Sequence, residues 1–247
     1  MWERLLKDIK EDESLPDIRA LLEEHLYTKN SIVQERDLDG FFHPSSLGGC
    51  LRRLWYAFMY TQPEHRIPLK LRFCFEHGHS VHDWMQSQLI AALEKIDGLD
   101  IYCEISIRDR KWVLPDSYAF RNNLAGSTDG LIVMQQDGVE KRAIYELKTA
   151  SVSVWDKLTK PNPKHIEQAS VYAECFGAED IIFQYYNKNT DLSKFFYVKK
   201  DPTRLEEISR TLGTIMGLAN DGKSPAKKYN KWECSTCPYY YTCRPEI

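Results

Sequence analysis

A hairpin signal at Asp137-Gly138 constrains the fold of this 247-residue chain more than any other feature of its sequence. Asp-Gly is favoured in two-residue β-hairpin turns, because both central residues of such a turn need a positive φ angle. Strand-like runs flank it at 125–136 and 139–149. A turn of this length without a bulge fixes which residues of the two strands face each other, so it also fixes which side chains share a face.

The predicted register brings two acidic residues together. Continued to the far end of the hairpin, it places Asp129 directly opposite Glu146, with Cβ atoms about 5 Å apart. Like charges so placed destabilise a sheet, and a divalent cation between them removes the repulsion. Lys148 lies two residues beyond Glu146 and shares its face. Such a trio can bind Mg²⁺ or Mn²⁺, lower the pKa of a bound water and steady a phosphate, which is the chemistry of phosphodiester hydrolysis.

A Glu-x-Lys sequence on a strand is more often an exposed salt-bridge face, so its surroundings decide the interpretation. Glu146 and Lys148 lie in an apolar stretch, 143–150, that is typical of a core strand. Burying charges there without a function would be costly. Asp129 is also bracketed by Gly126 and Gly130, where backbone can approach a ligand closely.

The order of predicted elements indicates an α/β fold with a central mixed β-sheet flanked by helices. Apolar spacing predicts helices over 1–36, 77–96, 164–176 and 202–220. A further helix, which Ser45 or Ser46 could cap, is predicted through Cys50 to Phe58. Strands are predicted at 99–108, 125–136, 139–149, 180–187 and 194–199. We divide the chain into an N-terminal helical region (1–98), a core (99–200) and a C-terminal helix with a cysteine-rich tail (201–247), which form one composite domain.

Composition narrows the class of protein. A net charge of −3 means that any nucleic-acid surface must be a local basic patch. No apolar run approaches the roughly 18 residues that a membrane span needs, and no secretory signal opens the chain, so we expect a cytoplasmic protein without a membrane partner. Four of the seven cysteines are scattered singly, which argues against a secreted disulfide framework.

Three motifs follow one another in the chain: Gly126-Ser-Thr-Asp129, Glu146-Leu-Lys148 and Gln168-Ala-Ser-Val-Tyr172. Together they resemble the PD-(D/E)XK nuclease superfamily, and most closely its RecB-like branch, which carries a Gln-x-x-x-Tyr helix. The resemblance implies a restriction-endonuclease-like core over 99–200 and metal-dependent DNA hydrolysis. It also implies an upstream metal-binding histidine, which His82 matches.

The resemblance assigns roles to these residues. Lys148 would help to activate water, and Gln168 and Tyr172, which share one helical face, would contact DNA or brace the lysine. A lone histidine on a helix is more often structural than a ligand, and Gln168 and Tyr172 could equally be a polar contact and a core aromatic. The implied ligands of Mg²⁺ or Mn²⁺ are His82, Asp129, Glu146 and the carbonyl of Leu147.

The C-terminal tail contains Cys234, Cys237 and Cys243 in a C-x₂-C-x₅-C pattern. Three soft ligands this close imply a metal centre whose fourth ligand lies elsewhere. Zinc is the general alternative, although its sites usually comprise two short pairs, and unligated thiols are another. A triplet with one distant cysteine resembles the iron–sulfur exonucleases of CRISPR adaptation and AddB-type nuclease domains. Cys50 matches the upstream ligand, so a structural [4Fe–4S] cluster would join the N-terminal helices to the tail.

Two basic stretches are candidates for DNA contact. Arg52 and Arg53 follow Cys50 directly. The second stretch lies before the Gln-x-x-x-Tyr helix, where lysines beside an aromatic residue could track phosphates and stack on bases, although a solvated loop has the same composition. Its residues are Trp155, Lys157, Lys160 and Lys164.

These features together predict a DNA exonuclease that acts on single strands or DNA ends through a metal-activated water. The alternatives are a structure-specific endonuclease and a non-cutting DNA-binding subunit of a recombination or CRISPR complex. The intact Asp129, Glu146 and Lys148 argue against the non-cutting subunit, and the lack of an evident sequence-reading module disfavours the endonuclease. A helicase, recombination or CRISPR partner is compatible with the sequence.

Overall fold

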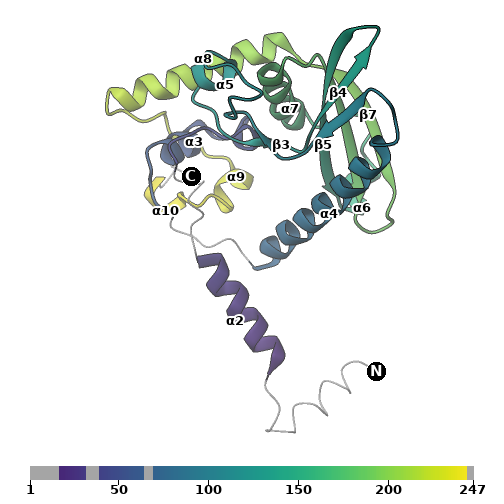
Figure 1. Cartoon of the computed structure of the whole chain (residues 1–247). Coiled ribbons are helices and arrows are strands. Elements are labelled where there is room, and N and C mark those ends of the chain that lie inside the picture. Colours follow the sequence, from purple (N-terminus) through teal and green to yellow (C-terminus); the bar gives the residue numbers. More distant parts are fainter. Residues whose placement is uncertain (1–16, 32–38, 64–68, 244–247) are drawn as a thin grey trace.

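The computed structural model describes residues 17–31, 39–63 and 69–243. A five-stranded sheet in the order β1-β4-β5-β6-β7 forms its centre (Figure 1). Only β5 and β6 run parallel; the other neighbouring strands are antiparallel. The predicted α/β fold with a central mixed sheet is therefore confirmed. The strands are β1 (Leu99–Tyr102), β4 (Gly130–Gln136), β5 (Val139–Ala150), β6 (Asp180–Asn187) and β7 (Ser193–Lys199).

The hairpin between β4 and β5 has the predicted turn. Asp137 and Gly138 have φ angles of 53° and 76°, and the flanking residues Gln136 and Val139 pair. The ladder keeps the predicted register as far as Gly130 opposite Tyr145. It ends there because the chain bends at the next residue, so the expected direct pairing of Asp129 with Glu146 is not formed.

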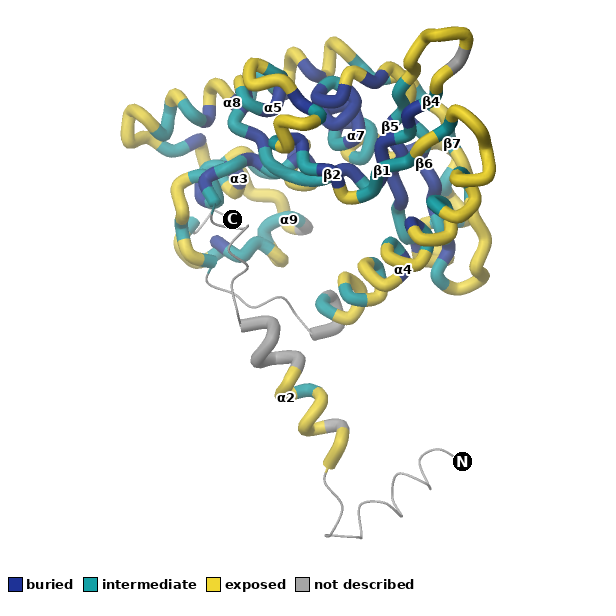
Figure 2. Tube along the Cα trace, viewed as in Figure 1, coloured by how far each residue is buried: buried dark blue, intermediate teal, exposed yellow. Residues whose placement is uncertain are grey.

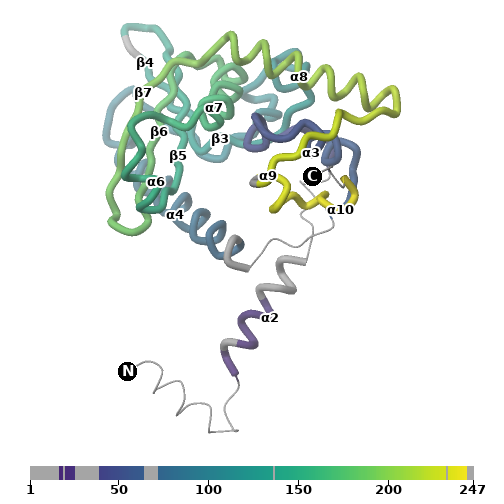
Figure 3. The backbone as a smooth tube through the Cα atoms, turned by 180° about the vertical axis from the view of Figure 1, so that it is seen from behind, coloured from purple at the N-terminus to yellow at the C-terminus, as the bar shows by residue number. Residues whose placement is uncertain are grey.

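Helices cover both faces of the sheet (Figures 1 and 3). The main core lies between the sheet and α5 (Tyr118–Arg121), α7 (Pro163–Phe176) and α8 (Pro202–Asn220). A smaller apolar cluster lies between the other face and α4 (Leu69–Leu93). Buried residues are most continuous along α7 and the strands beneath it, which places this helix at the centre of the fold (Figure 2).

Helices α7 and α8 begin close to where the sequence predicted them, because each has a side-chain cap. Asn162 Oδ1 accepts a hydrogen bond from the Lys164 backbone N–H at 2.9 Å. Asp201 Oδ1 does the same for Arg204 at 3.1 Å. A proline follows each capping residue, as favoured in the first turn of a helix.

Two elements differ from the prediction. Helix α4 begins at Leu69 rather than residue 77, and an Arg72–Glu76 ion pair at 2.6 Å supports the added turns. The strand expected over 99–108 is broken at Glu104, whose φ angle is +53°. Its second part, β2 (Ile105–Ser106), instead pairs with β3 (Ser127–Thr128) in a separate two-stranded sheet.

The N-terminal helix predicted over 1–36 is present as α2 (Ile18–Ser31), while 1–16 and 32–36 lie outside the described residues. Helix α3 (Leu51–Phe58) has Cys50 at its N-cap position. Ser45 and Ser46, the predicted caps, belong instead to the 3₁₀ helix η2 (Pro44–Ser46). Short helices α6 (Val152–Trp155), α9 (Lys231–Ser235) and α10 (Tyr240–Cys243) complete the described elements. Among those elements, none is long and apolar enough to cross a membrane.

Candidate active site

Glu146 of β5 is a fully buried carboxylate on the face of the sheet that α7 covers. Its Oε1 accepts a hydrogen bond from Lys148 Nζ at 2.5 Å, whereas its Oε2 is buried without a partner. Burial raises the pKa of Glu146 to about 7, with Lys148 opposing the shift and Asp129 adding to it. A buried carboxylate oxygen without a partner destabilises the folded protein. A cation bound to Oε2 would remove this cost.

Helix α7 provides a second hydrogen-bond acceptor for Lys148, in addition to Glu146. Gln168 Oε1 accepts a hydrogen bond from Lys148 Nζ at 3.1 Å, which is the bracing contact that the sequence allowed. Tyr172 lies one turn further along and is buried. Burial raises the pKa of its hydroxyl, and the nearby charges of Glu146 and Asp129 raise it further, so the hydroxyl stays protonated.

Asp129 lies at the bend between β3 and β4 and is held by two elements. Its Oδ2 accepts a hydrogen bond from the Leu147 backbone N–H at 2.7 Å, and its Oδ1 lies 3.3 Å from His82 Nδ1 of α4. Because the N–H and C=O of one strand residue point to the same side, the Leu147 carbonyl faces the edge where Asp129 lies. Burial alone would lower the pKa of His82, but the hydrogen bond to Asp129 and its charge raise it.

The sequence interpretation missed two residues that position Asp129. Gln86 Nε2 donates to the Asp129 carbonyl at 3.0 Å and to Glu104 Oε1 at 2.9 Å. Gln86 lies four residues after His82, so one face of α4 contacts both the side chain and the backbone of Asp129. The spacing of four residues shows from the sequence that Gln86 and His82 share a helix face. Only the tertiary structure shows that this face contacts Asp129.

The predicted metal ligands are thus neighbours, but their side chains do not converge on one point as the ligands of a bound metal ion would. His82 contacts Asp129, and Asp129 contacts Leu147, while Glu146 is bound to Lys148. Within 17–31, 39–63 and 69–243, no group of three or more His, Cys, Asp or Glu side chains is arranged so that it could hold a metal ion. The unpartnered Glu146 Oε2 is the observation that favours a cation here.

Gly126 makes room for the site. Its φ angle is +152°, and a Cβ atom there would lie 3.2 Å from both the Tyr172 hydroxyl and Pro44 Cδ. We expect Gly126→Ala to lower the free energy of unfolding by roughly 1–3 kcal/mol, because an L side chain is strained at this angle. Chemical denaturation measures the change. Gly213→Ala in α8, where a Cβ would meet nothing within 4 Å, should instead stabilise by about 0.5–1 kcal/mol.

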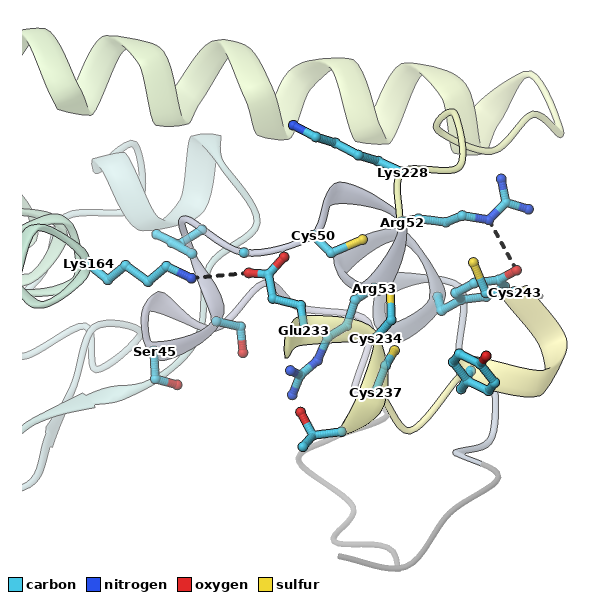
Figure 4. A pocket seen from close by; sticks show the side chains of 16 residues that line it. Ser45, Cys50, Arg52, Arg53, Lys164, Lys228, Glu233, Cys234, Cys237 and Cys243 are labelled. Carbon is cyan, nitrogen blue, oxygen red and sulfur yellow. Dashed lines mark hydrogen bonds and ion pairs between the residues drawn. The ribbon is translucent and has the colours of Figure 1, made fainter. Parts of the chain in front are cut away.

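The four predicted cluster cysteines come together around one pocket of about 240 Å³ (Figure 4). Cys50 precedes α3, Cys234 belongs to α9, Cys243 ends α10, and Cys237 lies between those two short helices. None of them forms a disulfide. Burial raises the pKa of the Cys243 thiol, Arg52 lowers it, and neighbouring Cys50 and Cys234 raise it again, which reflects the crowding of these sulfur atoms.

The structure does not show the iron–sulfur site that the sequence predicted, which stays a prediction. The cysteines are not arranged as a metal-binding group in the part of the chain that the structure describes. The long-range placement of Cys50 beside the tail is nevertheless as expected, since α3, α9 and α10 lie together at the end of the molecule away from β7 (Figures 1 and 3).

The basic residues predicted to meet DNA fall into two groups. Arg52, Arg53 and Lys164 all line the cysteine pocket. Arg52 is engaged inside the protein, because its guanidinium donates to the Pro225 carbonyl at 2.6 Å and to the Tyr56 hydroxyl at 3.3 Å. Arg53 is exposed, and Lys164 reaches Glu233 of α9 at 3.3 Å.

The second group lies on α6 and the segment after it. Lys157 and Lys160 are exposed, as a phosphate-binding role requires. Trp155 is half-buried against the main core, and Lys194 Nζ lies 4.6 Å from its ring centroid while donating to its carbonyl at 2.9 Å. Part of the Trp155 ring is therefore already used within the protein, which leaves less of it for stacking on a base.

Comparison with known proteins shows similarity of fold. No protein-family model and no curated protein matches the chain. The crystal structure of SSO0001 superposes with a TM-score of 0.54 at 19% identity, over 93% of this chain and 96% of that one. An alkaline exonuclease, LHK-Exo from Laribacter hongkongensis, superposes with a TM-score of 0.51 at 14% identity, over 76% of this chain and 94% of that one. Its complex with dAMP gives the same TM-score at 15% identity.

Proposed function

We propose that this protein is a metal-dependent deoxyribonuclease of the PD-(D/E)XK type, RecB-like branch. One observation carries the proposal: Glu146 is fully buried, leaves Oε2 unpartnered and lies beside Lys148, with Asp129 close enough to raise its pKa. A structural ion pair would satisfy both carboxylate oxygens, whereas a cation-binding carboxylate needs one of them free. The fold shared with an alkaline exonuclease supports the same interpretation.

The residues that would hold Mg²⁺ or Mn²⁺ are His82, Asp129, Glu146 and the carbonyl of Leu147. A divalent cation at this position would lower the pKa of water and offset the negative charge that develops on a phosphate. Lys148 is held by two side-chain acceptors, so its ammonium group is fixed in direction and can bind a phosphate oxygen or orient the attacking water. Tyr172, kept protonated by burial, supplies a hydroxyl that can donate a hydrogen bond.

Action on DNA ends is favoured over internal cleavage, because LHK-Exo, which shares this fold, is an alkaline exonuclease. We therefore expect the protein, with Mg²⁺ or Mn²⁺, to degrade linear single-stranded DNA to short products while circular single strands of the same sequence persist. Gel electrophoresis of end-labelled and circular substrates measures this. Equal cleavage of both would favour the structure-specific endonuclease, and DNA binding without any cleavage would favour the non-cutting subunit of a recombination or CRISPR complex.

We also propose that Cys50, Cys234, Cys237 and Cys243 bind a [4Fe–4S] cluster. All four line one pocket although about 180 residues of chain separate Cys50 from the other three, which supports this proposal. The positive charges of the nearby Arg52 and Arg53 also support it, because they favour the thiolate form of cysteine. The side chains would need to reorient to bind a cluster, because they do not form a metal-binding group as they stand. The role proposed for the cluster is structural: it would join α3 to the C-terminal tail.

A further inference from the structure

His165 lies beside the catalytic lysine, although none of the sequence motifs includes it. It belongs to α7, one turn before Gln168, and its Nδ1 lies 2.7 Å from the Tyr185 hydroxyl of β6. Tyr185 pairs with Lys148 in the parallel β5–β6 ladder, so both side chains leave the sheet on the same face. The rings of His165 and Tyr185 stack with their centroids 5.7 Å apart. His165 is therefore part of the same neighbourhood as Lys148.

The contact with the Tyr185 hydroxyl is the basis on which we assign the tautomer of His165. The hydroxyl oxygen accepts a hydrogen bond from the Asn162 backbone N–H at 3.0 Å. Within the described residues, the other polar atom that contacts this hydroxyl is His165 Nδ1. We assign the tautomer in which Nδ1 accepts the hydroxyl hydrogen, because this pairs the hydrogen of a buried hydroxyl. A neutral ring that accepts at Nδ1 carries its own hydrogen on Nε2. Burial, helped by the charge of Lys148, lowers the pKa of His165 to about 4, which keeps the ring neutral at pH 7.

The Nε2 hydrogen of His165 is available to a ligand. Across the described ranges, no hydrogen-bond partner of Nε2 is found, and Nε2 is not among the four buried polar atoms there that lack one. It therefore reaches solvent. Tyr185 also contacts Asn162, which follows Lys157 and Lys160 in the chain, so the exposed basic segment leads directly into the turn of α7 that carries His165.

We propose that His165 is a DNA-contacting residue of the active site, which donates a hydrogen bond from Nε2 to a non-bridging phosphate oxygen of the bound strand. The inference rests on the proposed nuclease function. A neutral N–H donor whose direction is set by a buried hydroxyl suits this role, because it loses little freedom when the phosphate binds. Tyr185 is then a positioning residue, since it acts on DNA only through the His165 ring.

Two amide substitutions separate this role from a structural one. His165→Gln keeps a polar N–H near the position of Nε2 but loses the group that contacts Tyr185. His165→Asn keeps a polar group near the position of Nδ1, where it can contact Tyr185, and loses the N–H donor at the position of Nε2. We expect His165→Asn and His165→Ala to lower kcat/KM on linear DNA roughly 10- to 100-fold, as for loss of a hydrogen bond to a charged group, and His165→Gln to stay within about threefold of the unaltered protein. If His165 only supports Tyr185, the order of Gln and Asn reverses, and the proposal is overturned.

DNA binding gives a second readout that needs no catalysis. In a Glu146→Gln background, His165→Asn should weaken the binding of a single-stranded oligonucleotide, whereas His79→Ala, at an exposed position of α4, should leave binding unchanged. In the protein with Glu146 intact, His79→Ala should also leave activity unchanged. Equal binding and equal activity of the folded His165→Asn variant, with folding checked by thermal melting, would overturn the proposal. If the unaltered protein cuts no DNA with either metal, the proposed function itself fails, which is a distinct result.

Discussion

Glu146→Gln should lower the rate of DNA hydrolysis on the order of a thousandfold while the protein stays folded. The amide retains an oxygen that can accept the Lys148 hydrogen bond, but it removes the charge that a divalent cation requires. Lys148→Ala should have an effect of similar size, because it removes the ammonium group that is paired with Glu146. Rates of release of labelled nucleotides from linear DNA measure both.

The matched control for Glu146→Gln lies on the same strand. Glu140 of β5 is an exposed carboxylate that pairs with Arg142 at 2.7 Å, far along the strand from the site. Glu140→Gln makes the same chemical change and should leave activity intact, since an exposed ion pair contributes little to stability. Full activity of a folded Glu146→Gln variant would sink the nuclease assignment.

A binding measurement tests the same carboxylate without substrate. Mn²⁺ should raise the melting temperature of the unaltered protein, because a ligand that binds only the folded state stabilises it. The same ion should have little effect on Glu146→Gln, which lacks the charged ligand. An equal shift in both proteins would place the metal elsewhere.

Cys237→Ala is the second substitution with a large expected effect. We expect the unaltered protein, purified without oxygen, to be brown and to contain iron, and the variant to contain little. A cross-link between α3 and the tail closes a long loop and stabilises a fold by about 3–5 kcal/mol. Loss of about 3 kcal/mol would lower the melting temperature by roughly 6–12 °C in a protein of this size.

Cys74→Ala is the control for this experiment, because Cys74 is exposed on α4 and does not line the cysteine pocket. It should retain both iron and thermal stability. Metal analysis after anaerobic purification separates the alternatives. Stoichiometric zinc without iron would show that the cysteines form a zinc site and not an iron–sulfur cluster. The absence of both metals would show that the four cysteines are free thiols.

Local patterns in the sequence were sufficient for much of the fold. Asp137-Gly138 determined the turn and the register of β4 and β5, because the two-residue period of a strand leaves one register that buries the apolar face. Apolar spacing placed the starts of α7 and α8 within one residue of Pro163 and Pro202, where the structure shows Asn162 and Asp201 as caps. The break at Glu104 was not predictable, since a positive φ angle there depends on the pairing of β2 with β3.

The sequence by itself determined the catalytic candidates: Glu146 and Lys148 share a strand face, and Gln168 and Tyr172 share a helix face, because backbone periods dictate this. The tertiary structure alone decided that Asp129 contacts Leu147 and His82 and does not pair with Glu146, because a chain bend and α4 direct its carboxylate. It alone revealed His165, whose partner Tyr185 is twenty residues away on another element. Contacts between elements depend on how helices pack on the sheet, and no local spacing encodes that packing.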